Sequence, residues 1–257
     1  MTTAAVDHQA LLAVAVEVVT AAAEAILARS GKRSALSYKS SATDPVTEAD
    51  LASASAIHGG LSRLRPQDGL LSEDGDQTES RNGLRWVADP LDGTVNYLHG
   101  IPNVAISLAC ERYVDGDWQA VVAVARDVHR RELFTAVLDG GSFCDGVPMA
   151  VTDPVPAEQA LIGTEYGYSV ASRTRQTGAM AKLAPRVADL RTSGSTVLDL
   201  CWTAAGRLDG FIEDELGRWD WAAGALLVTE AGGRVSPVAD GVLAGGPHLH
   251  RELSRLL

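Results

Sequence analysis

Hydrophobic and polar residues recur with two different periods along the chain, and these periods predict where helices and strands form. The apolar stretch within residues 6–29 carries Glu17 and Glu24 seven positions apart, which places both carboxylates on one face of a helix. Because a membrane-spanning helix would have to bury both acids, we expect an amphipathic helix of a soluble protein here. A second helix is expected over residues 48–64, closed by Pro66.

The segments that follow predict an α/β chain. Short apolar runs typical of strands occupy residues 70–72, 84–88, 101–112, 118–125 and 132–138. Asp115-Gly116-Asp117 predicts a hairpin turn between two of them. Further along, expected strands (161–165, 188–192 and 207–213) alternate with expected helices (195–205 and 221–231), which Ser195 and Asp220 can cap. We therefore expect mixed α and β layers in two tightly packed parts, residues 1–147 and 148–257.

Composition and charge exclude several classes of protein. The chain has 257 residues, is 46% hydrophobic and has a formal net charge of −11. An acidic surface repels duplex nucleic acid and anionic membranes, so neither is expected as a direct partner. Three cysteines without a C-x-x-C spacing indicate neither a disulfide framework nor a zinc site. With no basic segment ahead of the apolar stretch, a cytoplasmic location is expected.

The densest candidate chemistry lies in residues 86–94. An apolar strand end leads into Asp89, and Asp92 follows three positions later, directly before Gly93-Thr94. Two carboxylates in this arrangement can share a pair of divalent cations, with the carbonyl between them as a further ligand. The free N–H groups of Gly93 and Thr94 could bind a phosphate at a helix start. A structural turn followed by a helix cap would give the same pattern.

Two further acidic segments favour the metal interpretation. Glu73 follows the strand at 70–72, and Asp220 stands at the start of an apolar helix. Either residue alone could serve a turn or a cap. With Asp89, Asp92 and the Leu91 carbonyl they form an all-oxygen ligand set, which suits Mg²⁺ and is poor for zinc.

These motifs together resemble those of the inositol monophosphatase family. Asp-Pro-Leu-Asp-Gly-Thr at 89–94 and Trp-Asp-Trp-Ala-Ala-Gly at 219–224 match its two hallmarks. Lys39, residues 44–47, Asp50 and residues 194–196 match in order, so the resemblance covers nearly the whole chain. Residues 163–170, 198–201 and 205–209 look especially like the actinobacterial SuhB-type members. The resemblance implies the layered αβαβα sandwich shared with fructose-1,6-bisphosphatase-like sugar phosphatases.

The resemblance also implies roles for the acidic residues. Two or three Mg²⁺ ions would be held, the first by Glu73, Asp89 and the Leu91 carbonyl, the second by Asp89, Asp92 and Asp220, and a weaker third by Glu73 and waters. Thr94, oriented by Asp44, would act with the Glu73 site to activate a water that attacks phosphorus in line, without a covalent phosphoenzyme. The implied substrate contacts are Asp92, Gly93, Thr94, Gly194, Ser195, Thr196, Glu213 and Asp220.

Two residues have alternative roles, and two positions differ from the family pattern. Glu213 could instead be a surface acid in its acidic run, and Lys39 could reach the phosphate, reach a metal-ligating acid or lie in solvent. Asp74 stands where the family usually has Glu, which affects the surroundings of Glu73 rather than the ligands. Asp145 replaces a family Asn in a turn that tolerates both.

The expected function is therefore a Mg²⁺-dependent phosphomonoesterase acting on myo-inositol 1-phosphate or a similar small alcohol phosphate. The resemblance further implies a homodimer and inhibition by lithium. Histidinol phosphate, fructose 1,6-bisphosphate and 3′-phosphoadenosine 5′-phosphate are alternative substrates, since the metal ligands are common to all these relatives. A protein-interaction role of the SuhB type is the alternative from another class.

Overall fold

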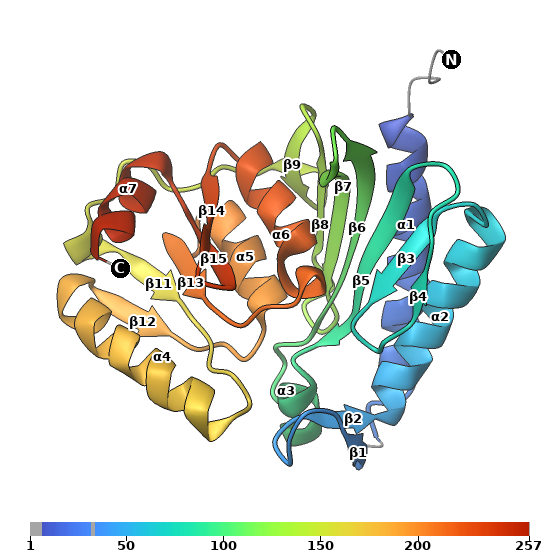
Figure 1. Ribbon diagram of the computed structural model, residues 1–257, viewed down its shortest axis with the longest axis horizontal. Coiled ribbons are helices and arrows are strands. Elements are labelled where there is room, and N and C mark those ends of the chain that lie inside the picture. Colours follow the sequence, from blue (N-terminus) through green and yellow to red (C-terminus); the bar gives the residue numbers. More distant parts are fainter. Residues whose placement is uncertain (1–6, 32–33, 257) are drawn as a thin grey trace.

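The computed structural model describes residues 7–31 and 34–256 (Figure 1). Its helices are α1 (His8–Leu27), α2 (Glu48–Leu64), α3 (Thr94–His99), α4 (Val170–Leu183), α5 (Thr196–Ala204), α6 (Arg218–Glu230) and α7 (Pro247–Leu256). Strands β1 (Ala35–Tyr38) and β2 (Pro45–Thr47) form a small sheet of their own. The expected start of the first helix at residue 6 lies outside the described residues.

Two larger sheets form the frame of the molecule. The eight-stranded sheet has the order β10-β9-β8-β7-β6-β5-β3-β4. Its strands are β3 (Gly69–Ser72), β4 (Gln77–Thr78), β5 (Leu84–Asp92), β6 (Ala105–Val114), β7 (Asp117–Asp127), β8 (Leu133–Val137), β9 (Gly141–Cys144) and β10 (Val147–Pro148). The five-stranded sheet has the order β12-β11-β13-β15-β14, from β11 (Leu161–Gly163), β12 (Asp189–Arg191), β13 (Gly210–Glu213), β14 (Arg234–Val238) and β15 (Gly241–Gly245).

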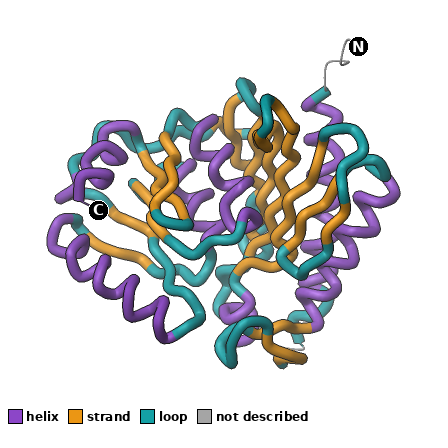
Figure 2. The backbone as a smooth tube through the Cα atoms, viewed as in Figure 1, coloured by secondary structure: helices purple, strands orange, loops and turns teal. Residues whose placement is uncertain are grey.

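The helices complete five layers. α1 and α2 cover one face of the eight-stranded sheet, and α5 and α6 lie between its other face and the five-stranded sheet. α4 and α7 cover the outer face of the five-stranded sheet (Figure 2). The expected αβαβα sandwich is therefore confirmed.

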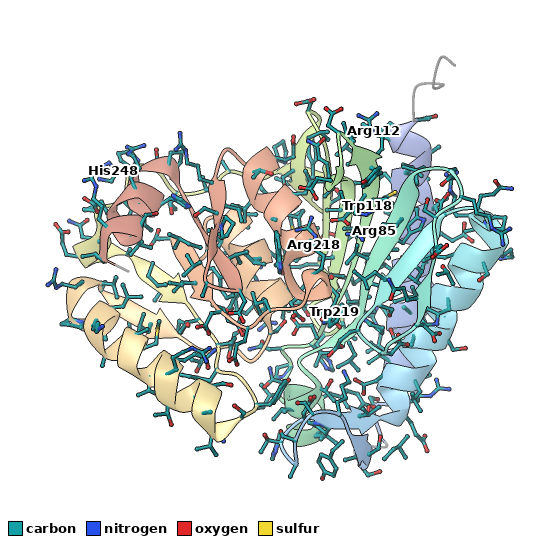
Figure 3. All side chains as sticks on the ribbon, viewed as in Figure 1. Arg85, Arg112, Trp118, Arg218, Trp219 and His248 are labelled. Carbon is teal, nitrogen blue, oxygen red and sulfur yellow. The ribbon has the colours of Figure 1, made fainter. Side chains whose placement is uncertain are left out.

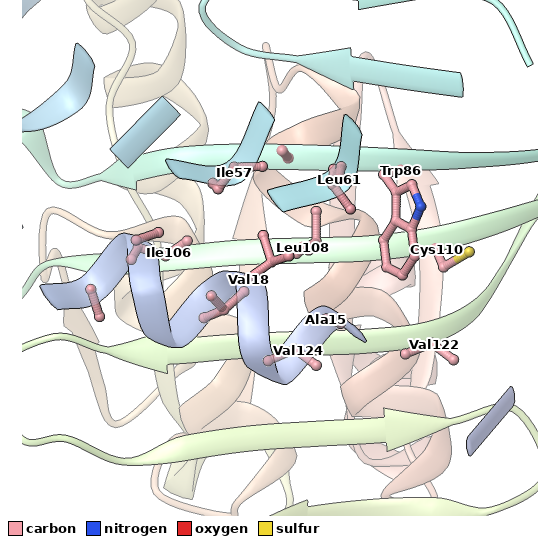
Figure 4. Packing of buried hydrophobic residues seen from close by; sticks show 14 of the residues in the cluster. Ala15, Val18, Ile57, Leu61, Trp86, Ile106, Leu108, Cys110, Val122 and Val124 are labelled. Atoms are coloured by element: carbon pink, nitrogen blue, oxygen red, sulfur yellow. The ribbon is translucent and has the colours of Figure 1, made fainter. Parts of the chain in front are cut away.

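The packing of the N-terminal helix α1 between α2 and the eight-stranded sheet explains why this helix is so apolar. α1 is long and apolar enough to cross a membrane by length and composition. Its Ala15 and Val18 are buried beside Ile57 of α2, against β-strand residues such as Leu108 (Figure 4). On its polar side Glu17 pairs with an arginine of α2 at 2.7 Å. The helix thus serves as a core helix of the sandwich, as its amphipathic pattern predicts.

Short sequence patterns correctly predicted the positions of a turn and of a helix start. The turn between β6 and β7 pairs Val114 with Asp117, and its central residues Asp115 and Gly116 have φ of 52° and 96°. Positive φ at both central positions defines the hairpin turn that matches strand twist, which confirms that prediction. Ser195 caps α5 by accepting a hydrogen bond from the Leu198 N–H.

One helix start differs from the expectation. α6 begins at Arg218 rather than at residue 221, so Asp220 lies in its first turn instead of capping it. Its carboxylate accepts a hydrogen bond of 2.7 Å from the Gly217 N–H. The start of α6 was predicted too late in the chain because Trp219 and Trp221 flank Asp220, and bulky side chains do not indicate a helix N-terminus as small polar ones do.

Candidate active site

A single cavity of about 590 Å³ gathers nearly all the predicted site residues. It is lined by Lys39, Asp44, Glu73, Asp89, Leu91, Asp92, Gly93, Thr94, Gly194, Thr196, Glu213 and Asp220, among others. These residues come from strands of both large sheets, from helices α3, α5 and α6 and from the segments between them. Folding thus brings together parts of the chain that are more than a hundred residues apart in the sequence.

Asp89 and Asp92 stand at the carboxyl end of β5. The pairing of β5 with β6 shifts register between them, and the Asp89 carboxylate accepts a hydrogen bond of 3.1 Å from the Leu91 N–H. Such a bulge breaks the strict alternation of a strand, which lets both carboxylates line one cavity. Gly93 follows with φ of 90°, and a Cβ there would lie 2.6 Å from the Asn103 carbonyl oxygen. Only glycine fits this corner.

Glu73 reaches the same cavity from the neighbouring strand. β3 runs parallel to β5, and the Glu73 N–H donates to the Ala88 carbonyl at 3.2 Å. The carboxyl ends of adjacent parallel strands meet at one sheet edge, so Glu73 and Asp89 become neighbours. Lys39 Nζ lies 2.6 Å from Glu73 Oε1, so this lysine reaches an expected metal-ligating acid in the present structure.

Asp220 completes the acidic cluster from the opposite side. The start of α6 is fastened to the first sheet by a hydrogen bond of 3.1 Å from Ser107 Oγ to the Trp219 carbonyl. Trp219 lies at the centre of the molecule in Figure 3, where α6 approaches the strands of the first sheet. The central helix thus delivers Asp220 to acids that the β-strands supply.

Burial and mutual repulsion dominate the electrostatics of the cluster. Burial raises the pKa of Asp89 and of Asp220 well above the ordinary range, and repulsion from Glu73 adds to it. For Asp92, burial raises the pKa to about 6 although Ser195 and Val197 donate hydrogen bonds to it. Among the described residues that line the cavity, Lys39 is the one lysine or arginine. Cations are the natural counter-charge for such a set.

The partner of Thr94 corrects a prediction. Thr94 Oγ1 donates to Asp50 Oδ1 at 2.8 Å, so Asp50 orients Thr94, and the expectation that Asp44 does so is wrong. Asp44 instead accepts hydrogen bonds from the backbone N–H and hydroxyl of Ser40. Asp50 belongs to a capping box with Thr47, which fixes its side chain at the start of α2. The T-x-x-D spacing at 47–50 was the signal for this position.

The Thr94 partner gives a first testable prediction. Asp50→Asn should lower kcat by about 100-fold, because an amide cannot take up the Thr94 proton as a carboxylate can. Asp44→Asn should lower it less than about tenfold, since its hydrogen bonds do not reach Thr94. Steady-state kinetics on the two purified variants, with urea unfolding as a check on folding, compare them directly. A larger loss of kcat in Asp44→Asn would contradict the assignment.

Residues 193–197, here called the substrate loop, lead into the first turn of α5 and lie against Asp92 of β5. Ser195 is 1% exposed, and its hydroxyl donates to Asp92 Oδ2 at 2.5 Å. The Val197 N–H donates to the same oxygen at 2.7 Å. The Ser195 side chain is therefore committed to a cluster carboxylate, which leaves Gly194 and Thr196 at the cavity wall.

Glu213 is a buried residue of the cavity rather than a surface acid. It ends β13, is 9% exposed and accepts a hydrogen bond of 2.6 Å from Thr196 Oγ1. Burial raises its pKa well above the ordinary range, against the lowering effect of Thr196. The next residues of its acidic run behave differently, since Asp214 and Glu215 pair with Arg175.

The cavity also contains residues that sequence reasoning missed. Glu165 and Tyr168 line it from the segment between β11 and α4. The Tyr168 carbonyl accepts a hydrogen bond from Thr43 Oγ1 at 2.7 Å, which ties this segment to the stretch between β1 and β2 that also carries Lys39. Glu165 was expected within the strand at 161–165, but β11 ends at Gly163, so both residues lie in the segment that follows it.

The donor set fits hard divalent cations. Four carboxylates and the Leu91 carbonyl are all oxygen ligands, and the cavity offers neither histidine nor cysteine among the described residues that line it. Mg²⁺ prefers oxygen donors of this kind. A separate group, His58 with Asp74 and Asp76, lies outside the cavity at the surface and brings a nitrogen donor close to two carboxylates.

Comparison with known proteins shows the family to which the chain belongs. A family model described as "Inositol monophosphatase family" matches residues 7–254. The chain is 38% identical over 242 residues to the inositol-1-monophosphatase SuhB of Mycobacterium tuberculosis, covering 85% of this chain and 80% of that protein. It is 38% identical over 201 residues to a Pseudomonas aeruginosa protein named Nus factor SuhB, covering 76% of this chain and 73% of that protein.

Solved structures show the same likeness in three dimensions. The extragenic suppressor protein suhB from Bartonella henselae superposes with a TM-score of 0.88 at 33% identity, covering 96% of this chain and 98% of that one. Mycobacterium tuberculosis SuhB superposes with a TM-score of 0.83 at 35% identity, covering 96% and 95%.

Proposed function

This chain belongs to the inositol monophosphatase family of phosphoric monoester hydrolases, and from that premise we propose that it hydrolyses myo-inositol 1-phosphate with Mg²⁺. The convergence of Glu73, Asp89, Asp92 and Asp220 on one cavity carries the proposal. An acidic protein can bind a phosphate monoester only where cations offset its charge. These four carboxylates are close enough to one another to bind such cations together.

The metal site follows the donor set. Glu73, Asp89 and the Leu91 carbonyl would hold one Mg²⁺, and Asp89, Asp92 and Asp220 a second, with Glu73 able to share a weaker third. When bound, Mg²⁺ polarises phosphoryl oxygens, lowers the pKa of water and neutralises charge on the leaving oxygen.

The protein's own residues orient the reactants. The Thr94 hydroxyl donates its hydrogen bond to Asp50, so its oxygen is free to accept a hydrogen bond from the attacking water. The backbone N–H groups of Gly93 and Thr94 would bind phosphate oxygens. Lys39 adds positive charge at the same wall, where the carboxylate of Glu73 raises the pKa of its ammonium against the effect of burial.

The substrate alcohol would occupy the opposite side of the cavity. Glu213 offers a buried carboxyl next to Gly194 and Thr196, which suits hydrogen bonds to the hydroxyl groups of a ring. A polyol also suits this part of the cavity, because its hydroxyl groups can pair with polar groups that would be costly to leave buried without a partner. These contacts favour the phosphate of a cyclic polyol over histidinol phosphate, which has no ring hydroxyls to offer.

A substrate panel tests this proposal. Phosphate release would be measured at saturating Mg²⁺ from myo-inositol 1-phosphate, histidinol phosphate, fructose 1,6-bisphosphate and 3′-phosphoadenosine 5′-phosphate. We expect the highest kcat/KM for inositol 1-phosphate and inhibition by lithium. Glu213→Gln should lower kcat/KM for inositol 1-phosphate by about tenfold more than for glycerol 2-phosphate, which lacks ring hydroxyls. Another preferred substrate would refute the role of Glu213.

Two further expectations remain proposals. We expect a homodimer located in the cytoplasm, without direct binding to nucleic acid or membranes. The name Nus factor SuhB of the Pseudomonas relative points to a protein-interaction role for that protein. Such a role here would survive Asp220→Asn, whereas the phosphatase activity would not.

A further inference from the structure

A buried glutamine interrupts the apolar side of α4. The residues that this helix buries are Ser172, Gln176, Met180 and Leu183, and the last two belong to the core between α4, α7 and the five-stranded sheet. Gln176 is only 5% exposed. A buried amide is costly unless both its donor and its acceptor are paired, so its partners indicate what this glutamine does.

Two segments that line the cavity meet next to this helix. β11 and β13 are parallel neighbours, so the residues that follow them leave the sheet at the same edge. Residues 164–169 follow β11 and residues 214–217 follow β13, and both segments contribute to the cavity wall. They approach closely, since a Cβ on Gly167 would lie 2.9 Å from Glu215 Oε2. The packing of these two segments therefore shapes the cavity next to Glu213.

The carboxamide of Gln176 is bonded to both segments. Its Oε1 accepts a hydrogen bond of 2.8 Å from the Gly167 N–H, and its Nε2 donates one of 2.6 Å to Asp214 Oδ1. A backbone N–H needs an acceptor and a carboxylate needs a donor, and an amide supplies one of each from a single planar group. Gln176 thus joins the segment after β11 to the segment after β13.

Residues 164–169 also reach the substrate loop. Glu165 Oε1 accepts a hydrogen bond of 2.5 Å from the Gly194 N–H. Gly194 has φ of 80°, and a Cβ on it would lie 2.5 Å from Asn96 Nδ2, so this position has no side chain through which it could be held. A shift of residues 164–169 would therefore move the substrate loop as well.

Two arginines of α4 contact the same segments from the solvent side. Arg175 is half exposed and pairs with Asp214 and Glu215, and Arg173 donates to the Tyr168 carbonyl at 2.9 Å. Charged contacts that water can reach contribute little. Hydrogen bonds of a buried amide are stronger, so this amide is the contact that fixes the two segments most firmly.

We propose that Gln176 is a positioning residue for the side of the cavity that binds the substrate alcohol. The inference rests on the proposed phosphatase reaction and adds a determinant of substrate recognition to it. Gln176 is not one of the residues that line the cavity, so it acts through residues 164–169 and 214–217 and does not touch the substrate. Its loss should weaken recognition of the ring and leave the hydrolytic step unchanged.

Steady-state kinetics test this role. Gln176→Met keeps the length of the side chain and loses both hydrogen bonds, so KM for myo-inositol 1-phosphate should rise by about tenfold while kcat stays within about twofold. For glycerol 2-phosphate, which offers no ring to this side of the cavity, KM should stay within about twofold. Gln119→Met, at an exposed glutamine of β7, is the matched control. An unchanged KM for myo-inositol 1-phosphate in Gln176→Met, or an equal rise for both substrates, would overturn the proposal.

An exchange of donor and acceptor separates the hydrogen bonds from the shape of the side chain. In the double variant Gln176→Glu with Asp214→Asn, the new carboxylate can accept from the Gly167 N–H and from the new amide at position 214, which can still accept from Arg175. KM for myo-inositol 1-phosphate should then lie within about threefold of the unsubstituted value. A KM as high as that of Gln176→Met would contradict the positioning role.

Amide hydrogen exchange on the full chain at saturating Mg²⁺ gives a readout that needs no activity. In Gln176→Met the Gly167 N–H loses its acceptor, so residues 164–169 should exchange at least about tenfold faster, while residues 234–238 of β14 stay unchanged. If the unsubstituted protein hydrolyses no substrate, the proposed function fails, and this comparison still decides whether Gln176 holds the segment. Unchanged exchange at 164–169, or faster exchange throughout the five-stranded sheet, would show that Gln176 is not a positioning residue.

Discussion

Asp220→Asn should abolish phosphatase activity, with kcat/KM falling by at least about 100-fold. Asp220 is the acid that α6 contributes to the cluster, opposite those of β3 and β5. An amide has nearly the same shape and can still accept from the Gly217 N–H, but it is a much weaker ligand for Mg²⁺ than a carboxylate. The substitution thus removes charge from the cluster while keeping its geometry.

The fold should survive this change. Burial opposes ionisation of Asp220, so replacing it by a neutral side chain should leave the urea midpoint of the metal-free protein at pH 8 unchanged or higher. Asp189→Asn, which removes an exposed acid paired only at the surface, serves as the matched control. Retention of more than a tenth of the unsubstituted kcat/KM by Asp220→Asn would show that Asp220 is not a ligand.

Glu111→Gln should cause the largest loss of stability, about 3 kcal/mol in the free energy of unfolding. Glu111 is 0% exposed, and its carboxylate pairs with Arg85 at 2.7 Å and with Arg218 at the start of α6. Figure 3 places both arginines near the centre of the molecule, where α6 meets the first sheet. Removing the charge leaves two guanidinium groups with a neutral partner.

Urea unfolding at constant ionic strength measures this loss. The matched control is Glu17→Gln, whose exposed carboxylate pairs with the exposed Arg63 at 2.7 Å. Exposed pairs contribute little, so the control should lose no more than about 1 kcal/mol. Because Arg218 is two residues from Asp220, Glu111→Gln should also weaken Mg²⁺ binding. Equal losses of stability in the two variants would contradict a structural role for Glu111.

Much of the fold could be predicted from local signals. The second helix occupies Glu48–Leu64, as the pattern predicts, because a capping box opens it and Pro66 follows it. α4 was missed since only Ser172, Gln176, Met180 and Leu183 are buried along its length, which leaves no continuous apolar stripe. β15 was missed because the apolar run at 241–245 contains no alternation that separates a strand from a helix.

The site could be predicted where its acidic residues are close together in the sequence. Two acids three positions apart at the end of β5 led us to expect a metal site, and the structure brings Glu73 and Asp220 to them. The Thr94 partner was misassigned because Asp44 and Asp50 both fit the pattern, and only the start of α2 decides between them. Glu165 was not singled out, although it closes the expected strand at 161–165, because its hydrogen bond comes from the N–H of Gly194, which is distant in sequence.

Phosphate release from myo-inositol 1-phosphate, measured against Mg²⁺ concentration on chelator-stripped protein, tests the metal-dependent mechanism most directly. We predict no release without Mg²⁺ and a saturable increase as Mg²⁺ is added to the stripped protein, because the carboxylates of the cavity cannot bind a phosphate unaided. Release at an unchanged rate in the presence of excess chelator would contradict it.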